Sequence, residues 1–519
     1  MSHPSNTRFR WVKWCSSARR RLTPFRRDLR EATFAQACAP AALAPSSKRW
    51  LRSAGSASRS PAMSRSMDGR SQTRASCLRT ARGGHCARTQ EGRFRPASCS
   101  SIRHFPDPGT LDISGRSQDP VFSASQNRCL PMRPDWLQPF TLALAAATTG
   151  YISWSGHALA LPAAIAFPAL WSLAHSRRAA SVVSAAYFLA ASRGLPQGVA
   201  AFYQSDIWPG LILWLVASSG FVFVHVALWS RQSGGWKALR YTIAMVLMAL
   251  PPFGIVGWAH PITAAGVLFP GWGWAGLAAV TAGLALMTTQ YRPAVAITLA
   301  GFWLWSAAFW TAPDIGRHWQ GVDLQLGNRL GRDNSLARHS DLVATLRSER
   351  RPGSTFMLLP ESALGFWTPS VERVWRQQLA EADLSVIAGA AVVDREGYDN
   401  VLVRVSATDS EILYRERMPV PGSMWQPWLA PIGKSGGARA DFFANPVVSV
   451  GGQRVAPLIC YEQLIIWPVL QSMLHDPDLV VAVGNDWWTK GTAIIGIQRA
   501  SAEAWARLFN KPLVMSFNT

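Results

Sequence analysis

Polar side chains follow three apolar runs in the last third of the chain, and their types could together do chemistry. Glu361 follows the run in MLLPES, Cys460 ends the run in APLIC, and Asn485 and Asp486 end the run in VVAVGND. Each alone has an ordinary explanation, because a glutamate after proline usually lies in a loop and a cysteine after an apolar run usually packs in a core. Since α/β folds build sites where strands end, three such positions in one domain predict a common site.

The chemistry that these residues could do is nucleophilic attack on an amide, ester or nitrile carbon. The thiolate of Cys460 is a strong nucleophile. A carboxylate in a poorly solvated pocket, such as Glu361, can take the thiol proton. The backbone N–H of Tyr461, at the turn after the strand, could donate a hydrogen bond to the oxyanion. Cys460 is the one cysteine after residue 131, so it is either a buried apolar residue or a reactive thiol.

Short apolar runs that alternate with amphipathic segments must position these residues. Over residues 318–519 this pattern predicts an α/β domain, in which helices cover a sheet. We expect strands at 321–325, 355–359, 385–391, 401–406, 411–415, 454–460, 479–483 and 512–517, and helices at 335–350, 370–382, 463–475 and 494–508. Glu361, Cys460 and Asn485 would then each lie at the end of a strand.

A strongly apolar stretch precedes this domain. Between Trp136 and Ala312 the one acidic residue is Asp206, and soluble domains do not have such a composition. Since a spanning helix needs about 20 apolar residues, residues 132–313 predict a transmembrane α-helical bundle of about seven spans. The expected spans are 136–155, 158–175, 179–197, 207–229, 240–258, 271–289 and 293–312. Tryptophans near the segment ends are typical of the bilayer interface.

Basic residues in the loops predict the orientation of this bundle. They lie before the first span and after the second, fourth and sixth, whereas the other side carries only Arg193, at the end of the third span. By the positive-inside rule the bundle begins in the cytoplasm, and after seven spans the domain that follows Pro313 lies outside it. We favour an anchor with lipid access over a transporter, because no charged pathway crosses the spans.

Residues 1–131 differ from the rest in charge and in cysteine content. They carry 24 Lys and Arg against 7 Asp and Glu, which gives 17 of the 22 net positive charges, and six of the seven cysteines. They sustain no helical or strand period, so we expect a disordered basic extension. We interpret it as lying outside the natural coding sequence, with translation starting at Met132. A basic arm for nucleic acid or anionic lipid and a targeting segment are the alternatives, and no nucleic-acid partner is expected for residues 132–519.

Five segments, in order, resemble the nitrilase superfamily of carbon–nitrogen hydrolases. Within it the sequence is similar to apolipoprotein N-acyltransferase and to a short relative of that enzyme from the conjugal transfer systems of bacterial plasmids. The segments are LLPESALGFW, YRERMPVPGSMW, LICYEQLI, GNDWW and SFNT. The resemblance covers residues 132–519 and implies a four-layer αββα sandwich after the membrane helices. It also implies a multi-pass protein of the bacterial inner membrane whose C-terminal domain is periplasmic, in agreement with the loop charges.

The resemblance implies a role for each matching residue. Glu361 would be the general base, Cys460 the nucleophile and Glu462 a supporting second carboxylate. The residues expected to bind substrate or shape its site are Tyr461, Asn485, Asp486 and Trp487. No cofactor and no metal ion are implied.

One position departs from the family pattern. Counting from Tyr414, the catalytic lysine of the family is replaced by Glu416. Losing one oxyanion donor typically costs about 10²–10³ in rate, so the replacement predicts a severe loss unless another cation takes its place. Arg417 is the candidate substitute in the catalytic set, although a guanidinium does not give up a proton near neutral pH. Lys490 is a second candidate.

Two functions therefore stay open. In the first, the chain is a membrane enzyme that forms a thioester at Cys460 and either transfers an acyl group or cleaves an amide. In the second, it is a catalytically impaired membrane component of conjugation that keeps the fold for a structural role. The expected partners are the lipid bilayer, with a phospholipid as acyl donor, and other conjugation proteins.

Overall fold

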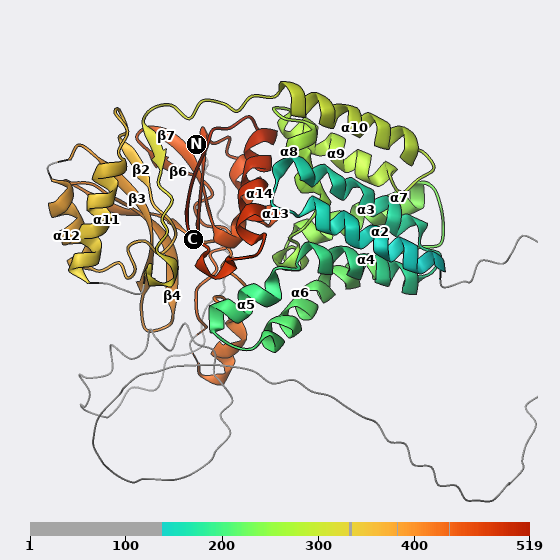
Figure 1. Ribbon diagram of the computed structural model, residues 1–519, viewed down its shortest axis with the longest axis horizontal. Coiled ribbons are helices and arrows are strands. Elements are labelled where there is room, and N and C mark those ends of the chain that lie inside the picture. The colour runs from blue at the N-terminus through green and yellow to red at the C-terminus, as the bar shows by residue number, and fades with distance from the viewer. Residues whose placement is uncertain (1–136, 332–334, 381, 435) are drawn as a thin grey trace, which may run out of the picture. The chain divides into compact units, whose positions relative to one another are not determined.

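The computed structural model describes residues 137–331, 335–380, 382–434 and 436–519 of the chain (Figure 1). The basic extension interpreted above, residues 1–131, lies outside the described residues. A helical part comes first along the chain, and nine strands with their covering helices follow it within the described ranges.

Helices form in each of the seven segments for which a membrane span is predicted. They are α2 (Leu137–Ser153), η1 (Ala158–Ile165) with α3 (Ala166–Leu173), α4 (Arg177–Ala191), α6 (Ile207–Leu228), α7 (Gly235–Ala249), α9 (Gly273–Leu286) and α10 (Arg292–Phe309). The third segment ends early, because a separate helix, α5 (Leu195–Tyr203), begins after Gly194 with proline in its first turn. Three short pieces complete this part, namely η2 (Phe253–Val256), η3 (Pro261–Ala264) and α8 (Ala265–Leu268).

One helix of the described residues, α6, is both long and apolar enough to cross a membrane by itself. Its 22 residues leave large apolar side chains uncovered, among them Trp208, Ile212 and Phe223. The segments Ala158–Leu173 and Gly273–Leu286 are apolar but shorter. The helices therefore lie where the sequence predicts them, and their number of membrane crossings stays a prediction.

Two sheets make up the part of the chain after residue 318. The first has the order β1 (Trp319–Gly321), β2 (Phe356–Leu358), β3 (Ser385–Val393), β4 (Tyr398–Val405) and β5 (Ser410–Arg415). The second has the order β6 (Val448–Val450), β7 (Gln453–Ile459), β8 (Leu479–Asn485) and β9 (Leu513–Asn518). The pairs β1–β2, β2–β3, β7–β8 and β8–β9 are parallel, and β3–β4, β4–β5 and β6–β7 are antiparallel.

The two sheets pack face to face between two layers of helices. Ile387 and Leu402 of the first sheet share a buried cluster with Ile459 and Val481 of the second, because alternate side chains of a strand point to opposite faces. The outer face of the first sheet is covered by α11 (Leu336–Glu349) and α12 (Pro369–Leu379), and that of the second by α13 (Ile466–Met473) and α14 (Ile494–Leu508) (Figure 1). The predicted αββα sandwich is therefore present.

The covering helices form for local reasons that the sequence carries. In α12 the Thr368 hydroxyl accepts a hydrogen bond from the Val371 backbone N–H, and Pro369 occupies the first turn. Val371, Trp375 and Leu379 recur every four residues and are buried against the first sheet. This stripe holds the sheet that carries Glu361.

The helical part packs directly on the sandwich. A Cβ atom built on Gly266 of α8 would lie 1.6 Å from the Ala504 carbonyl oxygen of α14, so only glycine permits this approach of the two backbones. The Tyr461 hydroxyl donates a hydrogen bond of 2.7 Å to the carbonyl of Ile255. The turn that carries Cys460 is therefore anchored to the loops between the apolar helices.

Two predicted elements are corrected by the structure, and one strand had not been predicted. The strand expected at 321–325 is Trp319–Gly321, and Leu324 instead forms an isolated bridge with Asn518. The helix expected at 463–475 begins at Ile466, because residues Cys460–Gln463 form a tight 3₁₀ turn, η6. The strand β6 was not predicted, since its three residues carry too short an apolar run to stand out.

Candidate active site

Cys460 lies directly after β7, in an unusual backbone conformation. Its φ angle is +45°, in the left-handed region that costs a non-glycine residue of the order of 1–3 kcal/mol. Glu462 closes the turn around Cys460, because its carboxylate accepts a hydrogen bond of 2.8 Å from the Ile459 backbone N–H. The thiol is 5% exposed. Strain of this kind is found where a side chain must be presented in a set direction.

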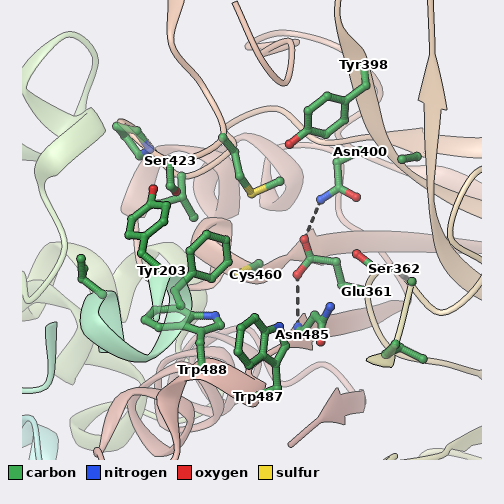
Figure 2. Close-up of a pocket in the computed structure, with 18 of the residues that line it drawn as sticks. Tyr203, Glu361, Ser362, Tyr398, Asn400, Ser423, Cys460, Asn485, Trp487 and Trp488 are labelled. Atoms are coloured by element: carbon green, nitrogen blue, oxygen red, sulfur yellow. Dashed lines mark hydrogen bonds between the residues drawn. The ribbon is translucent and has the colours of Figure 1, made fainter. Parts of the chain in front are cut away.

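Glu361 follows β2 and meets Cys460 from the other sheet. Its Oε1 accepts a hydrogen bond of 2.8 Å from Asn400 Nδ2, and its Oε2 accepts one of 3.1 Å from the Asn485 backbone N–H (Figure 2). Its carboxyl group and the Cys460 thiol line the same cavity. A Cβ on Gly389 would lie 2.5 Å from the Glu361 Cα, so a glycine there is required for this position.

The third predicted position, after β8, provides the rest of the wall. Asn485 reaches Glu361 through its backbone and accepts a hydrogen bond of 2.8 Å from the Asn518 side chain. Asp486 is buried, and with the Gln498 amide nitrogen turned toward it the carboxylate accepts hydrogen bonds of 2.8 and 2.9 Å. The structure thus brings together Glu361, Cys460 and Asn485, as predicted.

Glu462 and Arg417 form a separate cluster behind the turn. The Glu462 carboxylate accepts hydrogen bonds from the Tyr414 hydroxyl at 2.6 Å and from the Arg417 backbone N–H at 2.8 Å. The Arg417 Nε lies 3.6 Å from Glu462 Oε1 and donates to the Tyr414 hydroxyl at 2.8 Å. We call Tyr414, Arg417 and Glu462 the charge-paired cluster.

The structure does not bring Arg417 to Cys460. Its guanidinium is fully buried and donates to the carbonyl of Pro468, to Gln471 and to Ser472, all on or beside α13. The two remaining donors go to the Tyr414 hydroxyl and to the carbonyl of Pro457, so all five are used and none is turned to the thiol. The side chain predicted to replace the family lysine is thus used for packing, and Lys490 is exposed.

Asn400 and Glu416 complete the site, and sequence reasoning missed the first. The Asn400 Nδ2 donates to Glu361 at 2.8 Å and to Glu416 Oε2 at 2.8 Å, so one amide group bridges two carboxyl groups. We call Glu361 and Glu416 the carboxyl pair. The available signal was a polar residue inside the strand YDNVLVRV, where buried polar groups need a partner.

Two cavities meet at Cys460. The first encloses about 200 Å³ between the sandwich and helices α5 and α6 (Figure 2). Its lining includes Glu361, Asn400, Asn485, Trp487 and apolar side chains of the helices, namely Leu195, Val199 and Leu213. The second encloses about 120 Å³ and is lined by Cys460, Tyr461, Gln498 and mostly apolar residues of α6, α14 and the loop after η2. Cys460 therefore lies where two largely apolar cavities meet, and the polar side chains of Glu361, Asn400 and Asn485 belong to the first.

Comparison with known proteins identifies the family. The family model of the carbon-nitrogen hydrolases matches residues 189–507. The chain belongs to the carbon-nitrogen hydrolase family.

Relatives within this family include two conjugal transfer proteins. The chain is 63% identical over 388 residues to a probable conjugal transfer protein TraB of Sinorhizobium fredii, which covers 75% of this chain and 100% of the relative. It is 57% identical over 418 residues to the conjugal transfer protein TraB of Agrobacterium fabrum, covering 79% and 99%. A solved amidase of the nitrilase superfamily from Nesterenkonia aligns over 34% of this chain and 68% of its own, with 12% identity and a TM-score of 0.26.

Electrostatics distinguish this carbon-nitrogen hydrolase site from an ordinary carboxylate cluster. Burial raises the pKa of Glu361 to about 7, although hydrogen bonds from the Asn400 side chain and the Asn485 backbone oppose the rise. Burial, with the nearby Glu361 and Asp486, raises the pKa of the Cys460 thiol above its usual range. At neutral pH the sulfur is therefore a thiol, and Glu361 is poised to take its proton.

The first cavity is lined by one acidic side chain, Glu361, and mainly by apolar residues. None of the residues described along its wall is Lys or Arg, and Arg193 of the second cavity donates to the carbonyls of Trp154 and Ala190. Among the described residues no group of three or more His, Cys, Asp or Glu could hold a metal ion. The wall thus offers a thiol, a base and backbone N–H groups.

Proposed function

We propose that this carbon-nitrogen hydrolase is a membrane protein of plasmid conjugal transfer that forms a thioester at Cys460 and transfers an acyl group. The observation that carries the proposal is that Glu361 and Cys460 line one cavity, at the point where it meets a second, apolar cavity. The conjugal role is inferred from the names of the two TraB relatives, which this chain matches over almost their whole length.

The thioester would form by addition of the sulfur to the acyl carbon, which gives a tetrahedral oxyanion, followed by loss of the leaving group. Glu361 accepts the thiol proton, the Cys460 sulfur bonds to the acyl carbon, and the departing alcohol or amine takes that proton as its own bond to the carbon breaks. The Tyr461 N–H lies in the first turn of η6, where backbone N–H groups have no partner inside the helix, so it can donate to the oxyanion.

The second step would regenerate the thiol. An acceptor amine, or water in the amidase version of the reaction, gives a proton to Glu361 while its nitrogen or oxygen bonds to the thioester carbon. The bond from that carbon to the Cys460 sulfur then breaks, and Glu361 returns the proton to the sulfur. Asp486 is held away from this transfer by the Gln498 amide.

An acyl chain fits the apolar side of the site. Leu195, Val199 and Leu213 come from helices α5 and α6, and α6 is the described helix that could cross a membrane. Burying a methylene group gains about 0.8 kcal/mol, so a chain of several methylenes would be bound strongly by these side chains. A phospholipid is the acyl donor that such helices would meet, and the bacterial inner membrane is the proposed location.

A second function is favoured by the acidic surroundings of the thiol. The raised pKa of Cys460 and a first cavity whose described wall holds no lysine both slow thiolate formation. The alternative is therefore a catalytically impaired member of the family that serves conjugation as a structural membrane component, in contact with other conjugation proteins.

Intact mass spectrometry tests the enzyme. The purified full chain is incubated with phospholipid vesicles, and a mass increase equal to one acyl group is expected. Cys460→Ser and Glu361→Gln should lose the adduct, whereas Cys129→Ser, which removes a cysteine from the N-terminal extension, should keep it. The absence of any acyl adduct in the wild-type chain would refute the thioester.

Mating assays distinguish the enzyme from the structural alternative. A donor strain that lacks the chain is complemented with wild type or with Cys460→Ser. If the thioester is needed, the variant should transfer plasmid no better than the empty donor. Transfer at the wild-type frequency, with both proteins present at equal levels in the membrane, would favour the structural role.

The orientation is tested separately with a reporter fused after Thr519. An odd number of spans and the loop charges predict that alkaline phosphatase is active there and that a cytoplasm-dependent fluorescent protein is dark. The reverse pattern would contradict the periplasmic position.

A further inference from the structure

Glu416 has the least support for a negative charge of any carboxyl group described around Cys460. Its Oε2 accepts one hydrogen bond, from Asn400 Nδ2 at 2.8 Å. Its Oε1 is buried and has no hydrogen-bond partner in the described part of the chain. The side chain is 1% exposed, and the ion pairs of the described residues do not include it. A buried carboxylate with one hydrogen bond and no cation is very costly.

The neighbouring carboxyl groups are better supported. Glu462 accepts three hydrogen bonds and lies 3.6 Å from the guanidinium of Arg417. Asp486 accepts two hydrogen bonds from the Gln498 amide. All of these carboxyl groups are buried, so they differ in the hydrogen bonds and cations that compensate a negative charge.

We propose that Glu416 is held as a neutral carboxylic acid and acts as a positioning residue, which orients Asn400 and leaves Glu361 as the ionising member of the carboxyl pair. In this form the Oε2 atom is the carbonyl oxygen that accepts from Asn400, and the proton is on Oε1. Both hydrogens of the Asn400 amide are then used, one on each carboxyl group, so the amide cannot turn.

The charges that face Glu416 all favour the neutral form. Glu361 approaches from the end of β2 and Glu462 from η6, and both raise the pKa of Glu416, after burial itself. Arg417 is adjacent in sequence, but its charge is directed at Glu462. Cys460, on the turn after β7, is a thiol at neutral pH and brings no positive charge.

A proton kept on Glu416 has a consequence for catalysis. If both members of the carboxyl pair were ionised, the charge of Glu416 would hold the proton on Glu361 to a higher pH. With Glu416 neutral, Glu361 can ionise near neutrality and serve as the base. The inference rests on Glu361 being the base of the proposed function, and the tests below separate the two.

Infrared spectroscopy detects the proton directly. At about pH 8.5 Glu361 is largely ionised, so the wild-type chain should still show the carbonyl stretch of a protonated buried carboxyl group. Glu416→Gln should weaken this band by one carboxyl group, because burial also raises the pKa of Asp486, whereas in Glu361→Gln the Glu416 component should persist. If the Glu416→Gln difference spectrum shows only a lost carboxylate band, Glu416 is ionised and the inference is overturned.

Alkylation of Cys460 gives the functional readout. The rate of iodoacetamide labelling, followed on the Cys460 peptide by mass spectrometry, should rise with pH through a midpoint near 7 as Glu361 ionises. Glu416→Gln should keep that midpoint within about half a pH unit, because one neutral group replaces another. A fall of about one unit or more would show that a negative charge had been removed and would contradict the inference.

A third variant separates the outcomes. Glu361→Gln should abolish the rise near pH 7. If the rise survives in that variant, Glu361 is not the base and the proposed function fails, while the infrared result still decides the protonation of Glu416. If the rise is lost and only the Glu416→Gln midpoint moves, the proposed function stands and this inference fails.

Discussion

Two clusters of buried side chains flank the turn of Cys460, and their carboxyl groups are stabilised in opposite ways. The charge-paired cluster places a carboxylate, Glu462, against Arg417 and gives it the Tyr414 hydroxyl as a donor. The carboxyl pair places Glu361 and Glu416 on a single amide with no ion pair in the described residues. The carboxyl groups of both clusters are thus equally buried. The charge of Glu462 is compensated by a cation and by hydrogen bonds, whereas the carboxyl pair has no cation to compensate it among the described residues.

The difference teaches what each group is for. Burial raises the pKa of Glu462 too, but the charge of Arg417 and the hydrogen bonds of the turn oppose the rise, so this compensated carboxylate mainly fixes the geometry of the turn. An uncompensated carboxyl group has a raised pKa, so it can exchange a proton with substrate. The same distinction explains why Arg417, although adjacent to the site in sequence, is unsuited to act on a substrate.

The sharpest way to break the comparison is to remove the base. Glu361→Gln keeps the hydrogen-bonded shape but cannot accept the thiol proton, so Cys460 alkylation and acyl-adduct formation at about pH 8 should fall about 10²–10⁴-fold. Rates are measured on the Cys460 peptide. Glu372→Gln, on the half-exposed face of α12, is the matched control and should react like wild type. Equal rates in all three proteins would mean that the carboxyl pair is merely structural.

Removing the cation should instead reduce stability. Arg417→Met leaves Glu462 buried without its partner, and the free energy of unfolding should fall by about 3–5 kcal/mol. Denaturant unfolding in detergent measures it. The control is Arg415→Ala, two residues before Arg417 in the sequence. It breaks the partly exposed ion pair between Arg415 and Asp399 and should cost at most about 1 kcal/mol. If both variants lose the same free energy of unfolding, the buried charge-paired cluster stabilises the fold no more than a partly exposed ion pair does.

The sequence predicts the strands and helices of the α/β domain well because their signals are local, whereas the four-layer sandwich is implied by the family resemblance. The period of apolar residues placed α14 at Ile494–Leu508 and gave β5, β7 and β9 to within one residue at each end. The ends of three strands predicted Glu361, Cys460 and Asn485 together, since strand ends gather at one edge. The structure brings these three to one wall.

What the sequence could not predict depends on contacts between distant segments. Asn400 lies 39 residues from Glu361 along the chain, and nothing local says that its amide bridges two carboxyl groups. Arg417 was chosen for its charge and its place beside Glu416, but its direction is set by acceptors on α13, more than 50 residues away. The apolar helices are found where expected, yet their relation to a bilayer is a property of their surroundings and stays a prediction.

The pH dependence of stability should come mainly from the carboxyl pair. The folded pKa of Glu361, about 7, lies above its usual value of 4.5, so the folded chain binds more protons between these values. Its contribution is present below about pH 4.5 and is lost as the pH rises through 7, amounting to roughly 3 kcal/mol. Denaturant unfolding from acid to mildly alkaline pH should show this loss. Glu361→Gln should make the loss smaller by about this amount, because Glu416 and Asp486, whose pKa values burial also raises, still contribute. A loss of wild-type size in that variant would contradict the assignment.

The smallest test concerns the hydroxyl group that supports the charge-paired cluster. Tyr414→Phe removes one donor to Glu462 and one acceptor for Arg417, but the ion pair remains. Because hydrogen bonds to charged groups are worth more than neutral ones, the free energy of unfolding should fall by about 2 kcal/mol. Tyr461→Phe is the matched control: its hydroxyl donates to a neutral carbonyl, that of Ile255, so its loss should cost about 1 kcal/mol. A larger loss for the control would mean that the anchor to the apolar helices, rather than charge compensation, holds the Cys460 turn in place.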